Sequence, residues 1–449
     1  MASTSLSRTL GTSTNTYKGT VSVWFKKSIL SSDQVIYGNY TSGTQRAKLV
    51  VAGDGNLMYY QNDGGSVTIK LETTRLLRDY GAWYHVVLSV DTTQGTAADR
   101  VKLYVNGVQE TYFDTATYPN QNTVFYLNAN SVTNYIGQEG NSSDYWDGSM
   151  SHIHVVDGTA YPASTFGSTD STTGEWSINT SPSITMGTNG FTILKDGNTI
   201  TDQSSNSNDF SLVGGTLTSN KDCPDNNFAT WNNLYRSFSA GYASAPQNGM
   251  LYVNSATSNY HFSVASTLAF KGSGKFYWEY KIAAVGSETA VGISETDEFT
   301  LNNNASAQNY FWNQSQGYAY KNNGDKLNNN STASYGNTYT TNDIIQVAYN
   351  NGAIWFGKNG TWQNSATESE IAAGTTTNAA YTGITTSDLY HIAWNGLNTS
   401  GVYLNAGQGY FGTTAVSSAQ NPSSGDTSAI FEYTPPTGLQ PVTTKGINV

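Results

Sequence analysis

The sequence predicts an all-β protein made of two antiparallel β-sandwich domains of the jelly-roll type in tandem. Three observations predict this fold class. Apolar residues never recur at helical spacing for more than about two turns, whereas alternating apolar and polar residues are frequent. Turn-forming residues, among them 44 Gly, arrive at intervals typical of short strands. The 449 residues also exceed the length that one hydrophobic core usually organises.

The first expected domain covers residues 1–215. Residues 1–20 are polar, and the alternating segments that follow are each closed by Gly, Asp or Asn, which form turns. Residues 188–215 are interpreted as a return strand and a closing loop. The spacing fits an antiparallel sandwich. The other expected strands lie at 19–28, 34–40, 47–53, 56–62, 66–73, 83–91, 101–108, 122–130, 133–140 and 145–158.

The second expected domain covers residues 249–413, after a linker at 216–248 that contains Pro224 and several Asn. Its expected strands lie at 274–283, 289–294, 316–322, 389–395 and 405–412, around a meander at 343–362. Residues 414–449 contain two adjacent prolines, Pro435 and Pro436, so we expect this tail to run extended across the surface.

Each domain is expected to contain a meander with tight turns. In the second domain, Asn351-Gly352 and Asn359-Gly360 supply the positive φ angles that two-residue hairpins need. In the first domain, Asn106-Gly107 does the same. Between the two turns of the second meander, Trp355 alternates with Ile354 and Phe356, so it should lie on the opposite face of its strand.

Two tryptophans next to aromatic neighbours are expected to be largely buried. Trp83 and Trp278 each fall in a predicted strand, and large aromatic side chains in strands usually pack inward. The alternative for either residue is an exposed ring that stacks on a ligand.

Composition and charge limit the classes of binding partner that fit this chain. The net charge of −11 and the pI of about 4.8 argue against nucleic acid and against an anionic membrane surface. No window is long and apolar enough to span a membrane, and the polar N-terminus does not resemble a signal peptide. Cys223 is the one cysteine, so no intrachain disulfide is expected. If the protein acts outside a cell, we expect it to leave by assembly into a particle.

Several segments carry a family resemblance. GTVSVWFKKS, WYHVVLSVD, VKLYVNGV, NYIGQEG and YWDGSMSHIHVVDGTAYPASTFG resemble laminin-G-like, concanavalin-A-like jelly-roll domains, in particular those in virion proteins of marine tailed bacteriophages. GKFYWEYKI, VGIS, the meander and NAGQGYFG resemble, in that order, a SPRY domain. KDCPDNNFATWNNL and FEYTPPTGLQPV are similar to the interdomain segment and the C-terminal segment of such phage proteins.

A histidine pair could bind a metal ion. His152 and His154 stand two apart in a predicted strand and therefore on one face. A metal site needs a third and a fourth ligand, and the nearest acids in sequence are Asp147 and Asp157. We expect two packed or surface histidines, no metal site and no cofactor.

Calcium remains an alternative, because some laminin-G-like domains bind it. Residues 202–209 (DQSSNSND) are rich in side-chain oxygens, which Ca²⁺ prefers. Asx turns explain these residues equally well.

The sequence favours a protein without enzymatic activity. Jelly rolls of this type include glycoside hydrolases, which need two carboxylates across the scissile bond. An acidic run with alternating spacing on one strand is missing, and Glu295, Asp297 and Glu298 come closest, in a loop. Carboxylates from distant strands could still meet in space.

Three functions fit these observations. The first, implied by the resemblance, is a virion-surface protein, of the tail-fibre or head-decoration type, whose loops bind host-surface glycans. The second is a structural virion subunit that binds only other virion proteins. The third is a polysaccharide-degrading glycoside hydrolase.

Two aromatic-rich loops are the candidate glycan sites, because loops carry recognition in sandwiches. They lie at 141–146 (NSSDYW) and 309–312 (NYFW). The apolar faces of sugar rings stack on Tyr and Trp, so we expect a bound glycan to contact Tyr145, Trp146, Tyr310 or Trp312. The competing expectation is that these four side chains cap the ends of the cores.

Docking on a particle is expected to use a sandwich face or the tail at 431–449. Closed symmetry is the default for repeated subunits, so a homo-oligomer such as a trimer is an open expectation. The sequence has no coiled-coil heptads or fibrous repeat that would enforce one. An extended Pro-containing tail could lie along the sheet edge of a partner.

Overall fold

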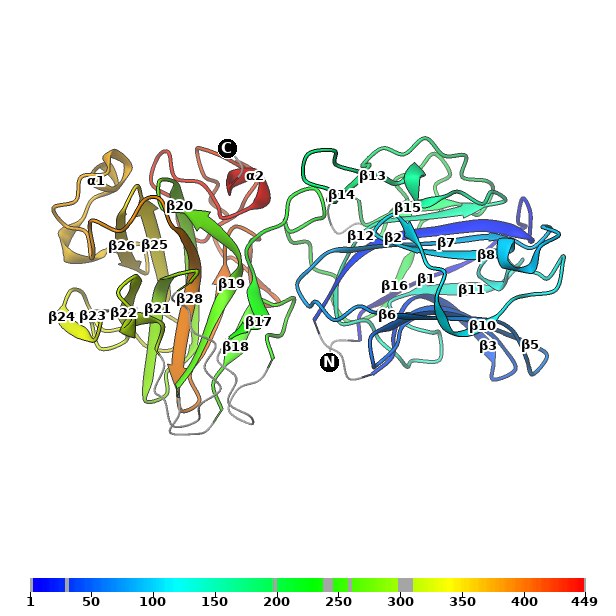
Figure 1. The fold of residues 1–449 in the computed structure, drawn as a ribbon, viewed down its shortest axis with the longest axis horizontal. Coiled ribbons are helices and arrows are strands. Elements are labelled where there is room, and N and C mark those ends of the chain that lie inside the picture. The colour runs from blue at the N-terminus through cyan, green and yellow to red at the C-terminus, as the bar shows by residue number, and fades with distance from the viewer. Residues whose placement is uncertain are drawn as a thin grey trace. The chain divides into compact units, whose positions relative to one another are not determined.

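The structure, a computed structural model, describes residues 3–28, 32–195, 197, 200–236, 245–256, 261–297 and 310–447. The chain divides into two compact units, Met1–Ser219 and Asn220–Val449, and each is built from antiparallel sheets (Figure 1). Helices in the described ranges are short, so the all-β prediction is confirmed. No helix among these residues is long and apolar enough to cross a membrane.

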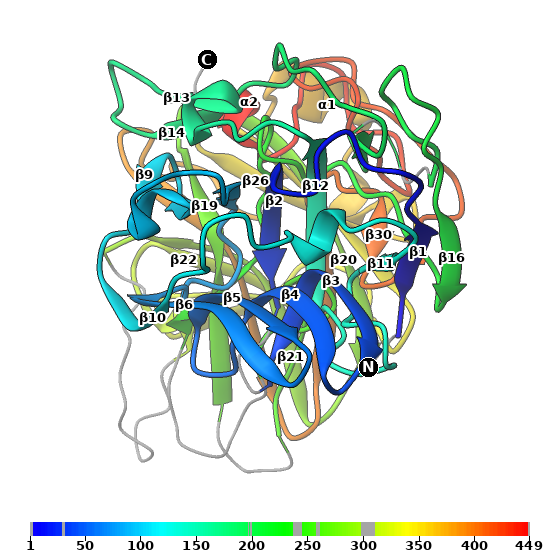
Figure 2. The ribbon, with the colours of Figure 1, turned by 90° about the vertical axis from the view of Figure 1, so that its right-hand side faces the viewer.

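Within the described residues, the first unit is a sandwich of two sheets, which form two layers in Figure 1. The larger sheet has the strand order β10-β6-β5-β4-β3-β11-β1-β16, and Figure 2 shows β5, β4 and β3 side by side. Its strands are β1 (Ser5–Thr9), β3 (Gln34–Ser42), β4 (Gln45–Val51), β5 (Asn56–Asp63), β6 (Ser66–Leu76), β10 (Phe113–Thr117), β11 (Thr133–Ile136) and β16 (Ser211–Gly214).

The smaller sheet of this unit has the order β15-β12-β2-β7-β8-β9, and a separate hairpin joins β13 to β14. Three 3₁₀ turns connect strands of the unit. The bounds of these elements are β2 (Lys18–Lys27), β7 (Tyr84–Asp91), β8 (Val101–Val105), β9 (Val108–Gln109), β12 (Gly148–Asp157), β13 (Gly167–Thr169), β14 (Trp176–Ile178), β15 (Phe191–Ile193), η1 (Ala97–Asp99), η2 (Tyr126–Asn128) and η3 (Ala163–Thr165).

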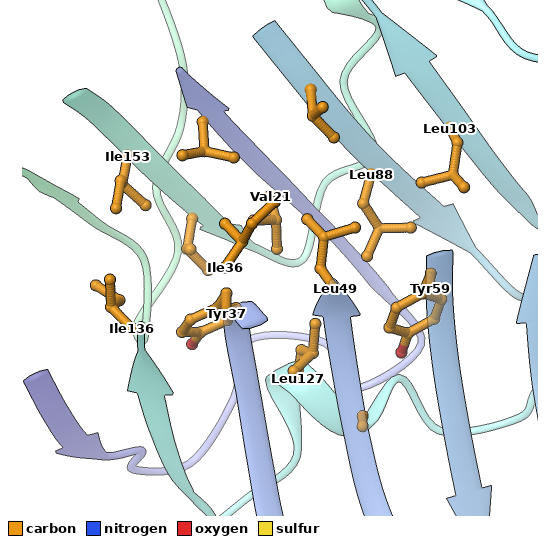
Figure 3. Packing of buried hydrophobic residues seen from close by; sticks show 14 of the residues in the cluster. Val21, Ile36, Tyr37, Leu49, Tyr59, Leu88, Leu103, Leu127, Ile136 and Ile153 are labelled. Carbon is orange, nitrogen blue, oxygen red and sulfur yellow. The ribbon is translucent and has the colours of Figure 1, made fainter. Parts of the chain in front are cut away.

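The core of the first unit lies between its two sheets (Figure 3). Val21 and Leu88 come from the smaller sheet, and Tyr37, Leu49 and Tyr59 come from the larger one; all five are fully buried. These are the inward positions of strands whose side chains alternate between two faces. Removing this apolar surface from water is the main stabilising contribution of the sandwich.

The predicted Asn106-Gly107 turn connects β8 to β9, with φ angles of 46° and 79°. A Cβ atom on Gly107 would lie 2.3 Å from the ring of Trp176. The position therefore requires glycine both for the left-handed backbone conformation and for the packing of the indole.

The second unit has the same plan in the residues that the structure describes. Its sheets have the orders β17-β19-β28-β21-β22-β23-β24 and β18-β29-β20-β25-β26-β27, and β30 pairs with β31. The elements of the first of these sheets are β17 (Trp231–Arg236), β19 (His261–Lys271), β21 (Glu288–Glu295), β22 (Gly317–Lys321), β23 (Asp325–Asn328), β24 (Ser331–Ser334) and β28 (Leu389–Leu397).

The remaining elements of the second unit are the strands of its other sheet, a small hairpin and four short helical segments. They are β18 (Tyr252–Asn254), β20 (Lys275–Ala284), β25 (Ile344–Asn350), β26 (Ala353–Lys358), β27 (Thr361–Trp362), β29 (Gly401–Asn405), β30 (Tyr410–Phe411), β31 (Thr414–Ala415), η4 (Phe311–Asn313), η5 (Gln363–Ser365), α1 (Glu368–Ala373) and α2 (Thr444–Ile447).

The meander of the second unit forms as predicted. Asn351-Gly352 joins β25 to β26 and Asn359-Gly360 joins β26 to β27, each with positive φ at both residues. Ile354 and Phe356 enter the core between the two sheets, whereas Trp355 lies in a separate apolar cluster on the other face. Both faces of β26 are therefore buried, and the outer face needs a cover.

The C-terminal segment provides that cover, which corrects the expectation that residues 414–449 run extended across the surface. Phe431 and Leu439 are fully buried in the same cluster as Trp355, and the ring of Phe431 meets Tyr277 edge-on at 4.9 Å. The segment is held by its own apolar side chains, which the two prolines did not reveal. It is a third layer of the second unit and not an extension along the surface.

The domain bounds also differ from the expected ones. The expected linker at 216–248 contains β17, which pairs with β19 in the second unit, and the boundary between the units falls after Ser219. Trp231, at the start of β17, is fully buried, so an apolar core position overrides the turn-rich composition of this segment.

The two tryptophan predictions have different outcomes. Trp278 in β20 is fully buried, as expected. Trp83 lies one residue before β7 and is half-buried. The Nζ atom of Lys26 lies 5.4 Å from the centroid of the Trp83 ring, a cation–π contact at the surface.

We predict that Phe431→Ala destabilises the second unit by about 3–5 kcal/mol, because the truncation leaves a cavity under the third layer. Urea unfolding of the full chain, followed by tryptophan fluorescence, measures this. Thr437→Ala, at an exposed position of the same segment, is the control and should change little. Equal stabilities of the two variants would contradict the assignment of the segment as a structural layer.

Candidate functional site

The first aromatic loop, 141–146, is fixed to the body of the first unit. Trp146 is 9% exposed, and its ring meets Phe25 edge-on at 5.0 Å. Its backbone N–H donates to the carbonyl of Gly137 at 3.0 Å. Tyr145 is half-buried. Trp146 thus caps the core and presents no ring face to a ligand, whereas Tyr145 remains partly accessible.

An ion cluster surrounds this loop. The Nζ atom of Lys48 in β4 lies 2.9 Å from Asp144, 3.5 Å from Glu139 and 3.6 Å from Asp33. Burial opposes the charge of the ammonium group, but the bond to Asp144 and the fields of Glu139 and Asp33 outweigh it and raise the pKa of Lys48. Arg46 forms a further ion pair with Glu139 at 3.2 Å. Lys48 and Arg46 therefore offset part of the negative charge of these three carboxylates.

The second aromatic loop, 309–312, lies on the outer face of the larger sheet of the second unit; Asn309 falls outside the described residues. Phe311 and Trp312 pack on small side chains of that sheet, and Trp312 is 5% exposed. Tyr310 is half-buried and stacks on Trp312 at 4.9 Å, and its ring also meets that of His261 edge-on at 4.0 Å. Burial and the charge of Glu288 raise the pKa of Tyr310 to about 12.

The four candidate residues therefore have different standing. Trp146 belongs to the core of the first unit, as expected of a capping residue, whereas Trp312 is buried in a separate cluster on the outer face of its sheet. Tyr145 and Tyr310 keep accessible surface and stay candidates for stacking on a sugar. The loop sequences alone could not separate them, because an aromatic residue before a strand can turn either way.

The histidine pair is part of the packing. The backbone of β12 is irregular between Ser151 and His154, and His152 has a φ angle of 49°, so the simple strand alternation fails there. His154 Nδ1 bonds to Thr192 Oγ1 at 2.9 Å. Burial, together with His152 and Lys195, lowers the pKa of His154 to about 3. In the part of the chain that the structure describes, no group of three His, Cys, Asp or Glu is placed to hold a metal ion.

In the oxygen-rich loop at 202–209, the carboxylate of Asp202 is used internally. Asp202 accepts hydrogen bonds from the backbone N–H groups of Thr192 at 2.9 Å, Ser204 at 2.8 Å and Asn208 at 2.8 Å. Asn206 Nδ2 donates to the carbonyl of Gly187 at 2.6 Å. This arrangement corresponds to the Asx-turn alternative.

Buried Glu279 deserves comparison with catalytic carboxyls, because burial raises its pKa to about 7, as in general acids. The carboxylate accepts from the backbone N–H groups of Glu432 at 2.9 Å and Tyr433 at 2.8 Å. The hydroxyl of Tyr277 and the amide of Asn405 donate to it as well. Glu279 is fully buried. Its carboxylate therefore holds the C-terminal segment by hydrogen bonds and is not placed to contact a substrate.

The acidic loop at 295–298, considered above as a hydrolase site, forms a hydrogen bond within its own turn. Glu295 accepts from the backbone N–H of Asp297 at 2.9 Å, which makes it part of its own turn. Glu298 lies outside the described residues.

The sequence did not predict two features of the first unit. One is the Lys48 cluster. The other is a hollow lined by Thr14, residues 184–188, Ser205 and Asn206. Both join segments more than 90 residues apart along the chain, and periodicity within one segment carries no signal of such pairings.

Comparisons with known families agree with the fold of each unit. Residues 3–165 match the model of the concanavalin A-like lectin/glucanases superfamily, and residues 275–380 match the SPRY domain model. The chain therefore contains a laminin-G-type lectin-like domain followed by a SPRY domain. No curated protein sequence matches the chain.

Solved structures with detectable similarity include a human SPRY domain, from HERC1, at 12% identity and a TM-score of 0.29, over 39% of this chain and 96% of that one. Domains LG4–5 of the mouse laminin α1 chain match at 11% identity and a TM-score of 0.26, over 87% and 78%. The CBM40 domain of a Ruminococcus gnavus IT-sialidase, bound to sialyllactose, matches at 17% identity and a TM-score of 0.22, over 32% and 70%. These similarities are too low to add to the family matches.

We predict that Lys48→Met lowers the free energy of unfolding of the first unit by about 3 kcal/mol, because the variant leaves partly buried carboxylates without their cation. Urea unfolding of the full chain measures the change. Lys70→Met removes a more exposed pair with Glu72 and should cost less than about 1 kcal/mol. If both variants lose the same free energy, the cluster has no special role.

We predict a pH dependence that originates at Glu279. Because the folded-state pKa of about 7 lies above the ordinary glutamate value of 4.5, the folded state binds the proton more tightly. The resulting stabilisation is fully present below pH 4.5 and is lost as the pH rises through about 7. Thermal melts across this range should show a fall in the Tm of the second unit.

The Glu279→Gln variant should remove this fall, since the amide does not titrate. Glu368→Gln, at an exposed position of α1, is the control and should keep the wild-type profile. A profile that the Glu279→Gln variant leaves unchanged would assign the dependence to another group.

Proposed function

We propose that this chain is a glycan-binding protein without enzymatic activity. The observation that carries the proposal is the match of residues 3–165 to a lectin superfamily model. The buried carboxylates described above bond to backbone donors or to cations of the chain. Recognition of a ligand therefore falls to exposed hydroxyl, amide and aromatic groups, which suit binding.

We further propose that the protein is exposed on a tailed-bacteriophage particle and binds host-surface glycans there. This setting rests on the resemblance of its segments to virion proteins. Assembly with other virion proteins would bring the chain to the particle surface. The docking surface would be a sandwich face, because the C-terminal segment is committed to the second unit.

A specific observation also favours the alternative of a structural subunit that binds another protein. Strand β16 pairs only with β1 among the described residues, and its side chains Leu212 and Val213 are 44% and 50% exposed. An edge strand with exposed apolar side chains can accept a strand of a partner. In this alternative the protein would bind particles and no glycan.

The hydrolase alternative comes from the superfamily itself, whose description includes glucanases. A hydrolase needs two carboxyls about 5–10 Å apart that a sugar can reach. Glu279 is enclosed and Glu295 belongs to a turn, so neither suits this role.

We predict that the purified full chain binds neutral or host-derived glycans on an array without releasing reducing sugar. We also propose that binding needs no metal, because no group of three His, Cys, Asp or Glu among the described residues is placed to hold one. Binding should therefore be the same in EDTA and in Ca²⁺. Loss of binding in EDTA would contradict the metal-free proposal. Absence of binding to any glycan, together with incorporation into particles, would favour the structural subunit.

A further inference from the structure

The hollow on the first unit has the size of a small-ligand site. It is lined by Thr14, residues 184–188, Ser205 and Asn206, and its volume is about 610 Å³. Ligand pockets commonly measure about 300–1,000 Å³. All of these residues except Thr14 lie beyond residue 165, where the match to the lectin model ends. The hollow is therefore built mainly by a part of the chain that the family model does not describe.

A buried carboxylate fixes two sides of the hollow to each other. Asp157 accepts from the backbone N–H of Thr14 at 2.7 Å and from that of Asn189 at 3.0 Å. Its own N–H donates to the carbonyl of Met186 at 2.8 Å. The wall formed by Thr14 and the wall formed by residues 184–188 thus share one anchor at the end of β12.

Asn206 joins the third segment to the same wall. Its Nδ2 donates to the carbonyls of Gly187 at 2.6 Å and Gly190 at 2.9 Å. Gly187 has a φ angle of 68°, and a Cβ atom there would lie 2.0 Å from the carbonyl oxygen of Asp157, so the position requires glycine. Three segments are held in one geometry, and such preorganisation reduces the entropy cost of binding.

The chemistry of the lining selects for an uncharged polar ligand. None of the lining residues carries a charge. Among the described residues, the hydroxyls of Thr185 and Ser205 have no hydrogen-bond partner, and neither has Oδ1 of Asn206. Ile184 and Met186 are half-buried and supply apolar surface. Hydroxyl and amide groups next to an apolar patch match a sugar ring, which has polar edges and apolar faces.

We infer that this hollow holds one residue of a neutral glycan, with its hydroxyls bonded to Thr185, Ser205 and Asn206. This inference rests on the proposed glycan binding and locates the binding site in the hollow.

The alternative place in this unit is the loop of Tyr145. Tyr145 precedes β12 and Asp157 ends it, so the two places lie at opposite ends of a strand of about 30 Å. The charged groups around Tyr145, among them Lys48 and Asp144, suit a charged ligand better. The two places can therefore be tested separately.

The experiment measures binding of the full chain on an array of neutral and acidic glycans, followed by calorimetric titration with the best neutral oligosaccharide. Ser205→Trp and Thr185→Arg fill the hollow at exposed positions without removing a bond of the fold. Ser168→Trp, at an exposed position of β13, is the control variant, and Tyr145→Ala tests the alternative place. Thermal melting verifies that each variant is folded.

We expect the wild-type chain to bind neutral glycans, and both filling variants to weaken binding at least about tenfold. The control at Ser168 should stay within about twofold of wild type. A larger loss of binding in Tyr145→Ala than in the filling variants would overturn the inference in favour of the Tyr145 loop. Unchanged binding by a folded filling variant, or binding of acidic glycans alone, would overturn the inference while the proposed glycan binding stands. A wild-type chain that binds no glycan would overturn both.

Discussion

The structure depends on hydrogen bonds to buried backbone N–H and C=O groups in long segments that belong to no sheet. Each unpaired N–H or C=O group in a protein interior costs free energy comparable to a lost hydrogen bond. In this chain, buried carboxylates and amides take the place of a neighbouring strand. Asp157, Asp202 and Glu279 each accept from two or more backbone N–H groups. Asn39 and Asn134 donate to backbone carbonyls of the η2 segment in the same way.

This constraint explains what the sequence could and could not predict. The meander at 343–362 was predicted to the level of individual faces, because Asn-Gly turns and alternation are local signals. The third layer was not, because its burial depends on an outer face of β26 that only the assembled sheet creates. A similar limit applies to Trp83, whose neighbouring strand begins one residue later than alternation indicated.

The candidate site shows the same division between local and distant information. Aromatic residues in loops are visible in a sequence, and Tyr145 and Tyr310 remain partly accessible where the neighbouring Trp146 and Trp312 do not. The hollow could not be predicted, although the loop at 202–209 contributes Ser205 and Asn206 to it, because its walls come from segments far apart in the sequence. Its defining bonds join Thr14 to Asp157 and Asn206 to Gly187, which are pairings that a single sequence does not reveal.

The third layer also brings the two ends of the second unit together. The backbone N–H of Ala229 donates to the carbonyl of Val442, and Phe228 forms a bridge with Thr443. The points where the polypeptide enters and leaves this fold are thus hydrogen-bonded neighbours. A module with adjacent entry and exit can be transplanted into a surface loop of an unrelated protein without stretching its host, because domain insertion is tolerated where chain ends lie close together. The second unit therefore has the geometry of an insertable domain, suited to transfer between proteins by recombination.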